Sequence, residues 1–238
     1  LVYKQLLYLK KKELTFNNIY LVMDKIEDVQ EVLKHIHYKN LIFNEFSQYN
    51  IIQHKSHLGK CGMATLTKIF TENDDANILF LEDDLFVTES YFDQCTTFFE
   101  TLYSDKSPIF IGYTNVNNKE SFFFETYCSI PQWGMATKLK DLKILCDFYY
   151  SEKNKQSIID SIRIKDFKDP VFSIYKNKII DINADYFIQR PNSLDVSFLF
   201  YLLYNEKKVW KKTKCNVYLD IMKPIYYNNK IINPIEMD

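Results

Sequence analysis

Glycine is the scarcest structural residue in this chain, with four copies in 238 residues, against about 7% in an average protein. The five cysteines form no C-x-x-C pair and their number is odd, so neither a zinc site nor a disulfide framework is expected. The sequence also lacks an Asn-x-Ser/Thr glycosylation acceptor. These absences favour a reducing compartment, and we predict a cytoplasmic protein.

The chain has no excess of either charge, with 30 Lys+Arg against 31 Asp+Glu. It therefore lacks the electrostatic footprint of a protein that binds nucleic acid in bulk. No apolar run is long enough to span a bilayer, and no signal-peptide pattern opens the sequence. We expect at most peripheral contact with a membrane surface.

A hydrophobic content of 47% is ample for a core, and the length fits one domain over residues 1–238. Apolar runs of strand length alternate with segments of helical periodicity, which predicts an α/β fold with a mainly parallel sheet flanked by helices. The expected helices are 1–13, 26–37, a segment ending near 70, 88–102 and 193–205. The expected strands are 18–23, 49–52, 78–81, 108–112 and 216–219. Because a helix opens the chain, we expect a first strand to be missing from the numbered sequence.

The most informative segment is a buried-strand pattern, Ile78-Leu79-Phe80-Leu81, that runs directly into Glu82-Asp83-Asp84. Three carboxylates at the end of a buried strand repel one another unless they hold a cation or face a cleft. Ligands of open α/β sheets bind beyond the carboxyl ends of strands. The alternative is that these acids only favour the dipole of the next helix, for which Thr88 or Ser90 is a candidate N-cap.

Three glycines bear on ligand binding. Gly59 and Gly62 flank Lys60 in a loop before a helix, where backbone N–H groups could approach a phosphate; ordinary turn chemistry is the alternative. Gly134 follows Trp133, which could form an aromatic wall against a sugar or be a core residue.

Several motifs occur in a fixed order: Asp24 at a strand end, His57-Leu58-Gly59-Lys60, Leu81-Glu82-Asp83-Asp84, Gln132-Trp133-Gly134-Met135-Ala136-Thr137 and Ser193-Leu194-Asp195. In this order they resemble GT-A-fold glycosyltransferases. They are similar to bacterial nucleotide-sugar transferases with LEDD and W-G-x-A-T motifs, and to the N-acetylglucosaminyltransferase I family with its EDD version of the DXD motif. The resemblance covers most of residues 14–222. It implies a nucleotide-sugar-binding half over 1–112 and an acceptor-side half over 113–238.

The resemblance also implies roles for the acids. Asp84 would bind Mn²⁺ or Mg²⁺, Asp83 a ribose hydroxyl, and Glu82 would lie near the donor sugar. Asp195 would be the base of an inverting transfer, although N-capping of its helix is an alternative reading. Without any motif to support them, Asp185 and Glu125 are the next candidates for the base.

By the same resemblance, the donor is a nucleotide-diphosphate sugar, most simply a UDP-sugar, and the acceptor a glycan, glycolipid or protein-linked or lipid-linked sugar. Its implied contacts are Asp24, Gly59, Lys60, Trp133 and Gly134. Two other readings stay open: a nucleotidyltransferase acting on sugar phosphates, and a carbohydrate-binding GT-A domain without turnover.

Two charged segments are read as ordinary surface. Asp74-Asp75 precedes its strand and is expected to form a solvated turn. Lys207-Lys208 and Lys211-Lys212 flank Val209-Trp210, which predicts a solvated strand edge; an anionic membrane surface or a lipid-phosphate acceptor is the alternative.

Overall fold

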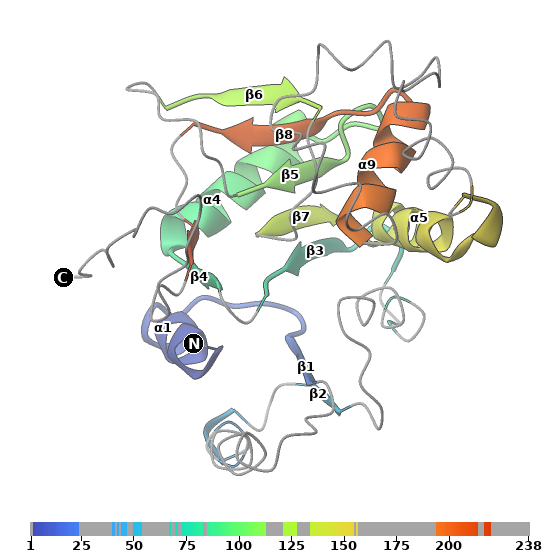
Figure 1. The fold of residues 1–238 in the computed structure, drawn as a ribbon. Helices are drawn as coiled ribbons and strands as arrows, with labels where there is room; N and C mark the ends of the chain where they lie inside the picture. The colour runs from blue at the N-terminus through green and yellow to red at the C-terminus, as the bar shows by residue number, and fades with distance from the viewer. Residues whose placement is uncertain are drawn as a thin grey trace, which may run out of the picture.

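The fold is described here from a computed structural model of the chain (Figure 1). The structure describes residues 2–23, 40, 42, 44–46, 50–53, 67, 70, 73–82, 85–112, 121–127, 134–154, 156, 194–213 and 217–219. No helix among these residues is long and apolar enough to cross a membrane. The described part of the chain is α/β, with a central sheet flanked by helices.

The central sheet has five strands in the order β3-β7-β5-β8-β6, which Figure 1 shows stacked from the middle of the view to the top. Their bounds are β3 (Asn77–Phe80), β5 (Ile109–Ile111), β6 (Phe123–Thr126), β7 (Met135–Lys138) and β8 (Val209–Lys212). The predicted strands at 78–81 and 108–112 are therefore confirmed. β6 and β7 were not predicted; for β7 the reason is that the Met135-Ala136-Thr137 segment was read only as part of a motif.

The prediction of a mainly parallel sheet is wrong for the described strands. Within the central sheet only β5 and β8 pair in parallel, whereas β3–β7, β5–β7 and β6–β8 are antiparallel. The cause is the position of β7, which lies between β3 and β5 and runs against both. Strand direction depends on which neighbours pair in space, and short apolar runs carry no signal for that choice.

Helices α5 (Leu139–Tyr150) and α9 (Leu194–Tyr204) pack on one face of the central sheet, called the α5/α9 face below. Alternate residues of the strands point to this face. They join one buried cluster with the two helices: Ile109, Ile111, Met135, Leu142, Leu145, Cys146, Tyr149, Leu194, Phe198, Leu202 and Val209. The predicted helix at 193–205 is confirmed, while α5 was not predicted.

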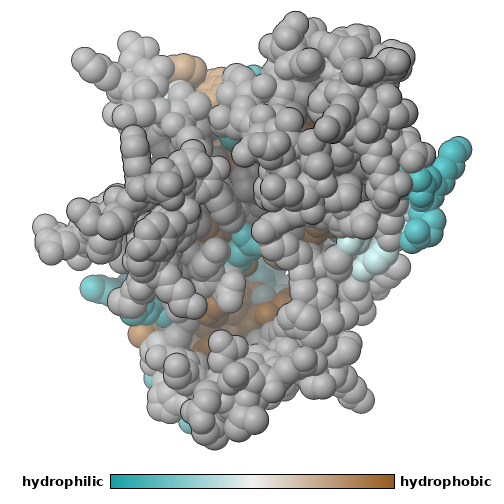
Figure 2. Space-filling view, viewed as in Figure 1, coloured by the Kyte–Doolittle hydropathy of each residue, from teal (hydrophilic) through white to brown (hydrophobic). Residues whose placement is uncertain are grey.

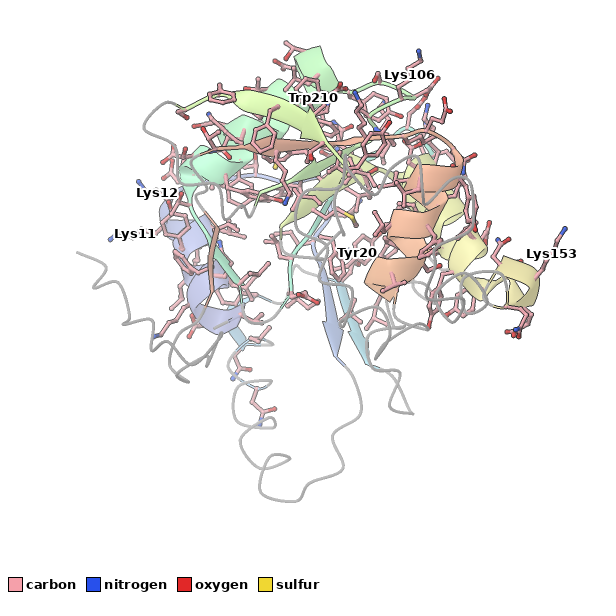
Figure 3. All side chains as sticks on the ribbon, turned by 45° about the horizontal axis from the view of Figure 1, so that its top comes forward. Lys11, Lys12, Tyr20, Lys106, Lys153 and Trp210 are labelled. Carbon is pink, nitrogen blue, oxygen red and sulfur yellow. The ribbon has the colours of Figure 1, made fainter. Side chains whose placement is uncertain are left out.

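The opposite face of the sheet packs against α4 (Glu89–Thr97) and the π-helical segment η2 (Phe98–Leu102), and is called the α4 face below. These two elements confirm the helix predicted at 88–102. Thr88 is the N-cap residue of α4, but its side chain makes no capping hydrogen bond. Instead, the Glu89 N–H donates to the Tyr8 hydroxyl oxygen at 3.0 Å. Trp210, labelled in Figure 3, donates from its indole N–H to the Leu102 carbonyl at 3.1 Å.

Two small sheets accompany the central one. β1 (Tyr20–Met23) pairs in parallel with β2 (Asn50–Gln53), and β4 (Leu85–Val87) pairs antiparallel with β9 (Val217–Leu219). The predicted strands at 18–23, 49–52 and 216–219 are thus confirmed. The predicted helix at 26–37 and most of the one ending near 70 lie outside the described residues.

Helix α1 (Val2–Lys11) confirms the predicted opening helix and packs beside β4. Its apolar side joins a small cluster of Leu6, Leu9, Ile42 and Phe46. Figure 2 shows apolar surface from described residues within a hollow in the lower half of this face. Gln5, which is 6% exposed, bonds the Val87 backbone twice: its amide donates to the Val87 carbonyl at 3.1 Å and its oxygen accepts from the Val87 N–H at 2.8 Å.

Gln5→Leu is expected to lower the free energy of unfolding by about 2 kcal/mol, because it leaves two buried backbone groups without their side-chain partner. Gln94→Leu is the matched control. Gln94 is equally buried, and its carbonyl oxygen has no partner among the described residues. The control should change stability by less than about 0.5 kcal/mol or raise it. Urea denaturation of both variants measures the difference, and equal losses would show that the bonds to Val87 add nothing.

Of the two predictions about charged surface segments, one is confirmed and the other is wrong. Asp74 and Asp75 form an exposed turn before β3, as predicted. The segment 209–212 is not a sheet edge, because β6 pairs along its outer side. The lysine pairs on both sides of Val209-Trp210 suggested a solvated strand edge, but Lys211 is only 6% exposed. The partner strand β6 was not predicted, which is why β8 was taken for an edge.

Candidate functional site

The candidate site is the edge of the central sheet at which β3, β5 and β8 end. These three strands run in the same direction, because β3 and β5 are both antiparallel to β7 and β8 is parallel to β5. The amino ends of β7 and β6 meet the same edge. Leu81-Glu82, Gly112 and Gly134 therefore lie along one line at the ends of adjacent strands. This is the place where ligands bind in open α/β sheets.

Two of the four glycines in the chain meet at this edge. The Gly112 N–H donates to the Gly134 carbonyl at 2.8 Å, one step beyond the β5–β7 ladder. Gly134 has φ 68°, in the left-handed region, and is buried. A residue with a Cβ is disfavoured there both by its own backbone and by the packing around it. Gly134 therefore fixes how the chain enters β7 from the position of Trp133.

The acid run begins where β3 ends. Phe80 pairs with Met135, so the next residues, Leu81 and Glu82, come beside Gly134. The Glu82 carbonyl accepts from the Leu85 N–H at 3.2 Å, which makes a tight turn into β4. Asp83 and Asp84, the ribose and metal ligands of the prediction, follow Glu82 in the sequence and lie outside the described residues. The described part of the chain holds no group of three or more His, Cys, Asp or Glu side chains that could bind a metal.

Both flanks of this turn are anchored. On one side β3 pairs with β7, and on the other β4 pairs with β9 and receives the two hydrogen bonds from Gln5. Leu85 and Val87 are buried, at 2% and 0% exposed. The sequence between Glu82 and Leu85 is therefore held at fixed ends, which is what a site that positions carboxylates requires.

Asp195, the predicted base, is the second residue of α9. Its side chain lies outside the described part, but its neighbour Leu194 is 1% exposed and belongs to the α5/α9 cluster. Ile111 and Met135, the residues of β5 and β7 at the candidate edge, belong to that cluster too. The first turn of α9 therefore packs into the cluster to which this edge contributes.

Several predicted donor contacts cannot be placed. Asp24 follows the last residue of β1, and Trp133 precedes Gly134; both lie outside the described residues, as do Gly59, Lys60 and Asp185. Of the predicted site residues, the structure thus brings Glu82 and Gly134 together.

Glu125 is not suited to be the base. Its carboxylate accepts a hydrogen bond from the Ser107 hydroxyl and lies 3.5 Å from the Lys208 ammonium. It is on β6, four strands from β3, which corresponds to roughly 19 Å at the usual strand spacing. A structural ion pair at the far strand accounts for this side chain.

A separate network of charged side chains lies at the opposite end of the strands, near the amino end of β3. Lys138 and Lys140 lie 3.4 and 3.5 Å from Asp75, and Lys138 is the main cause that holds the pKa of this exposed carboxyl below its usual value. Tyr103 donates to Asp141 at 2.6 Å; burial, followed by this bond to Asp141, raises the pKa of the tyrosine. These contacts join the amino end of β3 to α5 and account for the charges of the Asp74-Asp75 turn.

The buried Cys95 thiol is not a nucleophile of the candidate site. Cys95 is a buried thiol outside any disulfide, and burial raises its pKa to about 12. It is therefore a neutral thiol at physiological pH and a poor nucleophile.

Sequence reasoning missed one residue at the candidate edge. Lys211 is the cross-strand partner of Ile111 and lies on the buried α5/α9 face. A signal was available in the sequence, because alternate residues of a strand share a face. Lys211 therefore shares a face with Val209, which is a core residue, whereas Lys212 shares the other face with Trp210.

No protein-family model matches this chain, and no curated protein sequence matches it. Its function is therefore argued from its motifs and from the geometry of the candidate edge.

Proposed function

We propose that this protein is a metal-dependent glycosyltransferase that moves a sugar, with inversion, from a nucleotide-diphosphate sugar to a glycan, glycolipid or protein-linked acceptor. In this proposal the fold is of the GT-A type. Asp84 binds Mn²⁺ or Mg²⁺, Asp83 binds the ribose, Glu82 lies by the donor sugar, and Asp195 is the base.

One observation supports the proposal most directly: two motifs that are about 50 residues apart in the sequence are adjacent in space. Phe80 pairs with Met135, so Glu82, where the acid run begins, and Gly134, the described glycine of the second motif, flank the same point of the sheet edge. A metal-binding acid run needs a wall against which the donor sugar can lie. The β3–β7 register supplies that neighbour from the second motif.

The chemistry explains why carboxylates at this edge suit such a reaction. As the glycosidic bond breaks, negative charge builds up on the leaving diphosphate, and a divalent cation bridging its phosphates offsets that charge. Carboxylate oxygens are the ligands that Mn²⁺ and Mg²⁺ prefer. The acceptor hydroxyl must lose its proton as it attacks, which is the work of a carboxylate base such as Asp195.

The proposal is tested by calorimetric titration of UDP into the protein with Mn²⁺ and with EDTA. We expect binding only with the metal, because the acid run repels a bare diphosphate. GDP and CMP, titrated in parallel, identify the base if UDP is not preferred. Equal affinity in Mn²⁺ and EDTA would remove the metal bridge. Metal-dependent binding of a nucleoside triphosphate, and release of pyrophosphate from that triphosphate when a sugar phosphate attacks its α-phosphate, would instead indicate a nucleotidyltransferase.

A further inference from the structure

Lys211 is a largely buried lysine whose side chain has no partner in the described part of the chain. The residue is 6% exposed, and its side chain forms no hydrogen bond, ion pair or ring contact with a described residue. The other lysines of this segment all have partners: Lys207 lies over Tyr201, Lys208 pairs with Glu125, and Lys212 lies over Phe123. Its Nζ is not one of the fully buried polar atoms without a partner, so the stem is buried while the ammonium keeps contact with solvent, where an anion can meet it. Lys211 is therefore suited to an anion that is brought by a ligand.

An aromatic pair adjoins Lys211 on the outer strand. Phe124 is its cross-strand partner on β6, and Phe122 contacts Phe124 edge to face at 6.1 Å between ring centroids. Phe122 is 43% exposed, the second most exposed of the large apolar side chains described. Its backbone is fixed, because it exchanges two hydrogen bonds of 3.1 Å with Thr213. Aromatic rings held in this way offer a flat apolar surface on which the C–H face of a sugar can stack.

The location of this group fits an acceptor better than the donor diphosphate. Lys211 and Phe122 lie at the same sheet edge as Glu82, since β3, β5 and β8 end together there. β8 is three strands from β3, which corresponds to about 14 Å. That separation leaves room for a donor sugar between a metal-bound diphosphate at β3 and the lysine at β8.

From these observations we propose that Lys211, Phe122 and Phe124 form a subsite for an acceptor sugar that carries a carboxylate or a phosphate. The ring stacks on the phenylalanines and the anionic group pairs with the Lys211 ammonium. Its role as an acceptor site rests on the proposed glycosyltransferase function. The binding of an anionic sugar does not need metal or donor.

The test measures affinities of glucuronic acid, glucose 6-phosphate and glucose by NMR titration, without metal or nucleotide. The wild type is expected to bind at least one anionic sugar about tenfold or more tighter than glucose, the scale of one hydrogen bond to a charged group. Preference for glucuronic acid alone indicates a carboxylate acceptor, and preference for glucose 6-phosphate alone a phosphorylated one. Equal affinity for the three sugars, or binding of none, overturns the proposal.

Variants assign the effect to the lysine. Lys211→Met should bring the anionic sugars down to the affinity of glucose, while Lys211→Arg keeps the preference. Lys212→Met is the matched control, because this neighbour lies on the α4 face over Phe123; it should bind as the wild type does. Phe122→Ala, at an exposed position, should weaken all three sugars alike. The assignment to Lys211 is contradicted if folded Lys211→Met still prefers anionic sugars, or if Lys212→Met loses that preference. If Lys211→Met does not fold, the Lys211→Arg and Phe122→Ala results decide.

The two functional proposals fail separately. If the protein binds anionic sugars but nucleotide binding does not depend on metal, the glycosyltransferase proposal is wrong and a carbohydrate-binding site remains. If nucleotide binding depends on metal but the protein shows no preference for anionic sugars, the glycosyltransferase proposal stands and the subsite proposal is wrong.

Discussion

Asp84→Asn is expected to lower metal-dependent sugar transfer about a thousandfold and to abolish the difference in UDP affinity between Mn²⁺ and EDTA. An amide is a poorer ligand than a carboxylate for a hard cation. A bound metal stabilises the leaving group by several kcal/mol in the transition state, and each 1.36 kcal/mol corresponds to a factor of about ten in rate. Donor turnover and calorimetry on the same protein preparation measure both effects.

Two other aspartates serve as controls for this variant. Asp74→Asn removes a carboxylate from the exposed turn at the opposite end of β3, where the side chain pairs with Lys143; transfer should be unchanged. Asp195→Asn should keep metal-dependent UDP binding and lose transfer by about a hundredfold, because a base acts in the chemical step. Asp195 lies inside α9 and is not its N-cap, so a merely structural role in the first turn of this helix predicts near-normal transfer in the Asn variant. If Asp84→Asn transfers sugar normally, the ligand assignment is wrong.

Phe110→Ala is expected to lower the free energy of unfolding by about 4 kcal/mol, the usual cost of removing a fully buried phenyl ring. Phe110 is 0% exposed. Its ring centroid lies 6.4 Å from Tyr91, 5.9 Å from Phe98 and 5.7 Å from Phe123. It therefore joins α4 and η2 to β5 and β6, and its loss leaves a cavity between the sheet and its helix.

The control for this core position is Phe122→Ala. The same substitution at a side chain that is 43% exposed should cost about 1 kcal/mol or less. Urea denaturation gives both values, and the thermal midpoint of Phe110→Ala should fall by roughly 10 °C. Similar losses in the two variants would mean that the α4 face is not the packed core seen here.

Much of the local structure could be predicted from the sequence because it depends on local patterns. The helices at 2–11 and 89–102 show apolar residues at helical spacing, the helix at 194–204 is a longer and almost continuous apolar run, and β3 and β5 are short apolar runs. β6 and β7 were missed for different reasons. Phe123–Thr126 has no apolar alternation, since Glu125 faces Ser107 and Lys208, and Met135–Lys138 was read as a motif and not as a strand.

For the candidate site, the sequence was sufficient to select the acid run and its chemistry, because carboxylates directly after a buried strand are a local pattern. It could not show that Lys211 is buried, because that depends on β6, which pairs from a segment about 85 residues earlier. The same missing partner made β8 look like a sheet edge. Burial of a charged residue is decided by the neighbours on both sides of its strand.

By itself, the sequence determined the class of fold, the positions of most described helices and strands, and the acid run at the end of β3, since each follows from the periodicity and chemistry of adjacent residues. Only the tertiary structure decided strand order and direction. The insertion of β7 between β3 and β5 made the sheet largely antiparallel, and it placed Gly134 beside the start of the acid run. Such pairings join residues distant in the chain, and they are selected by how both faces of the sheet are buried together.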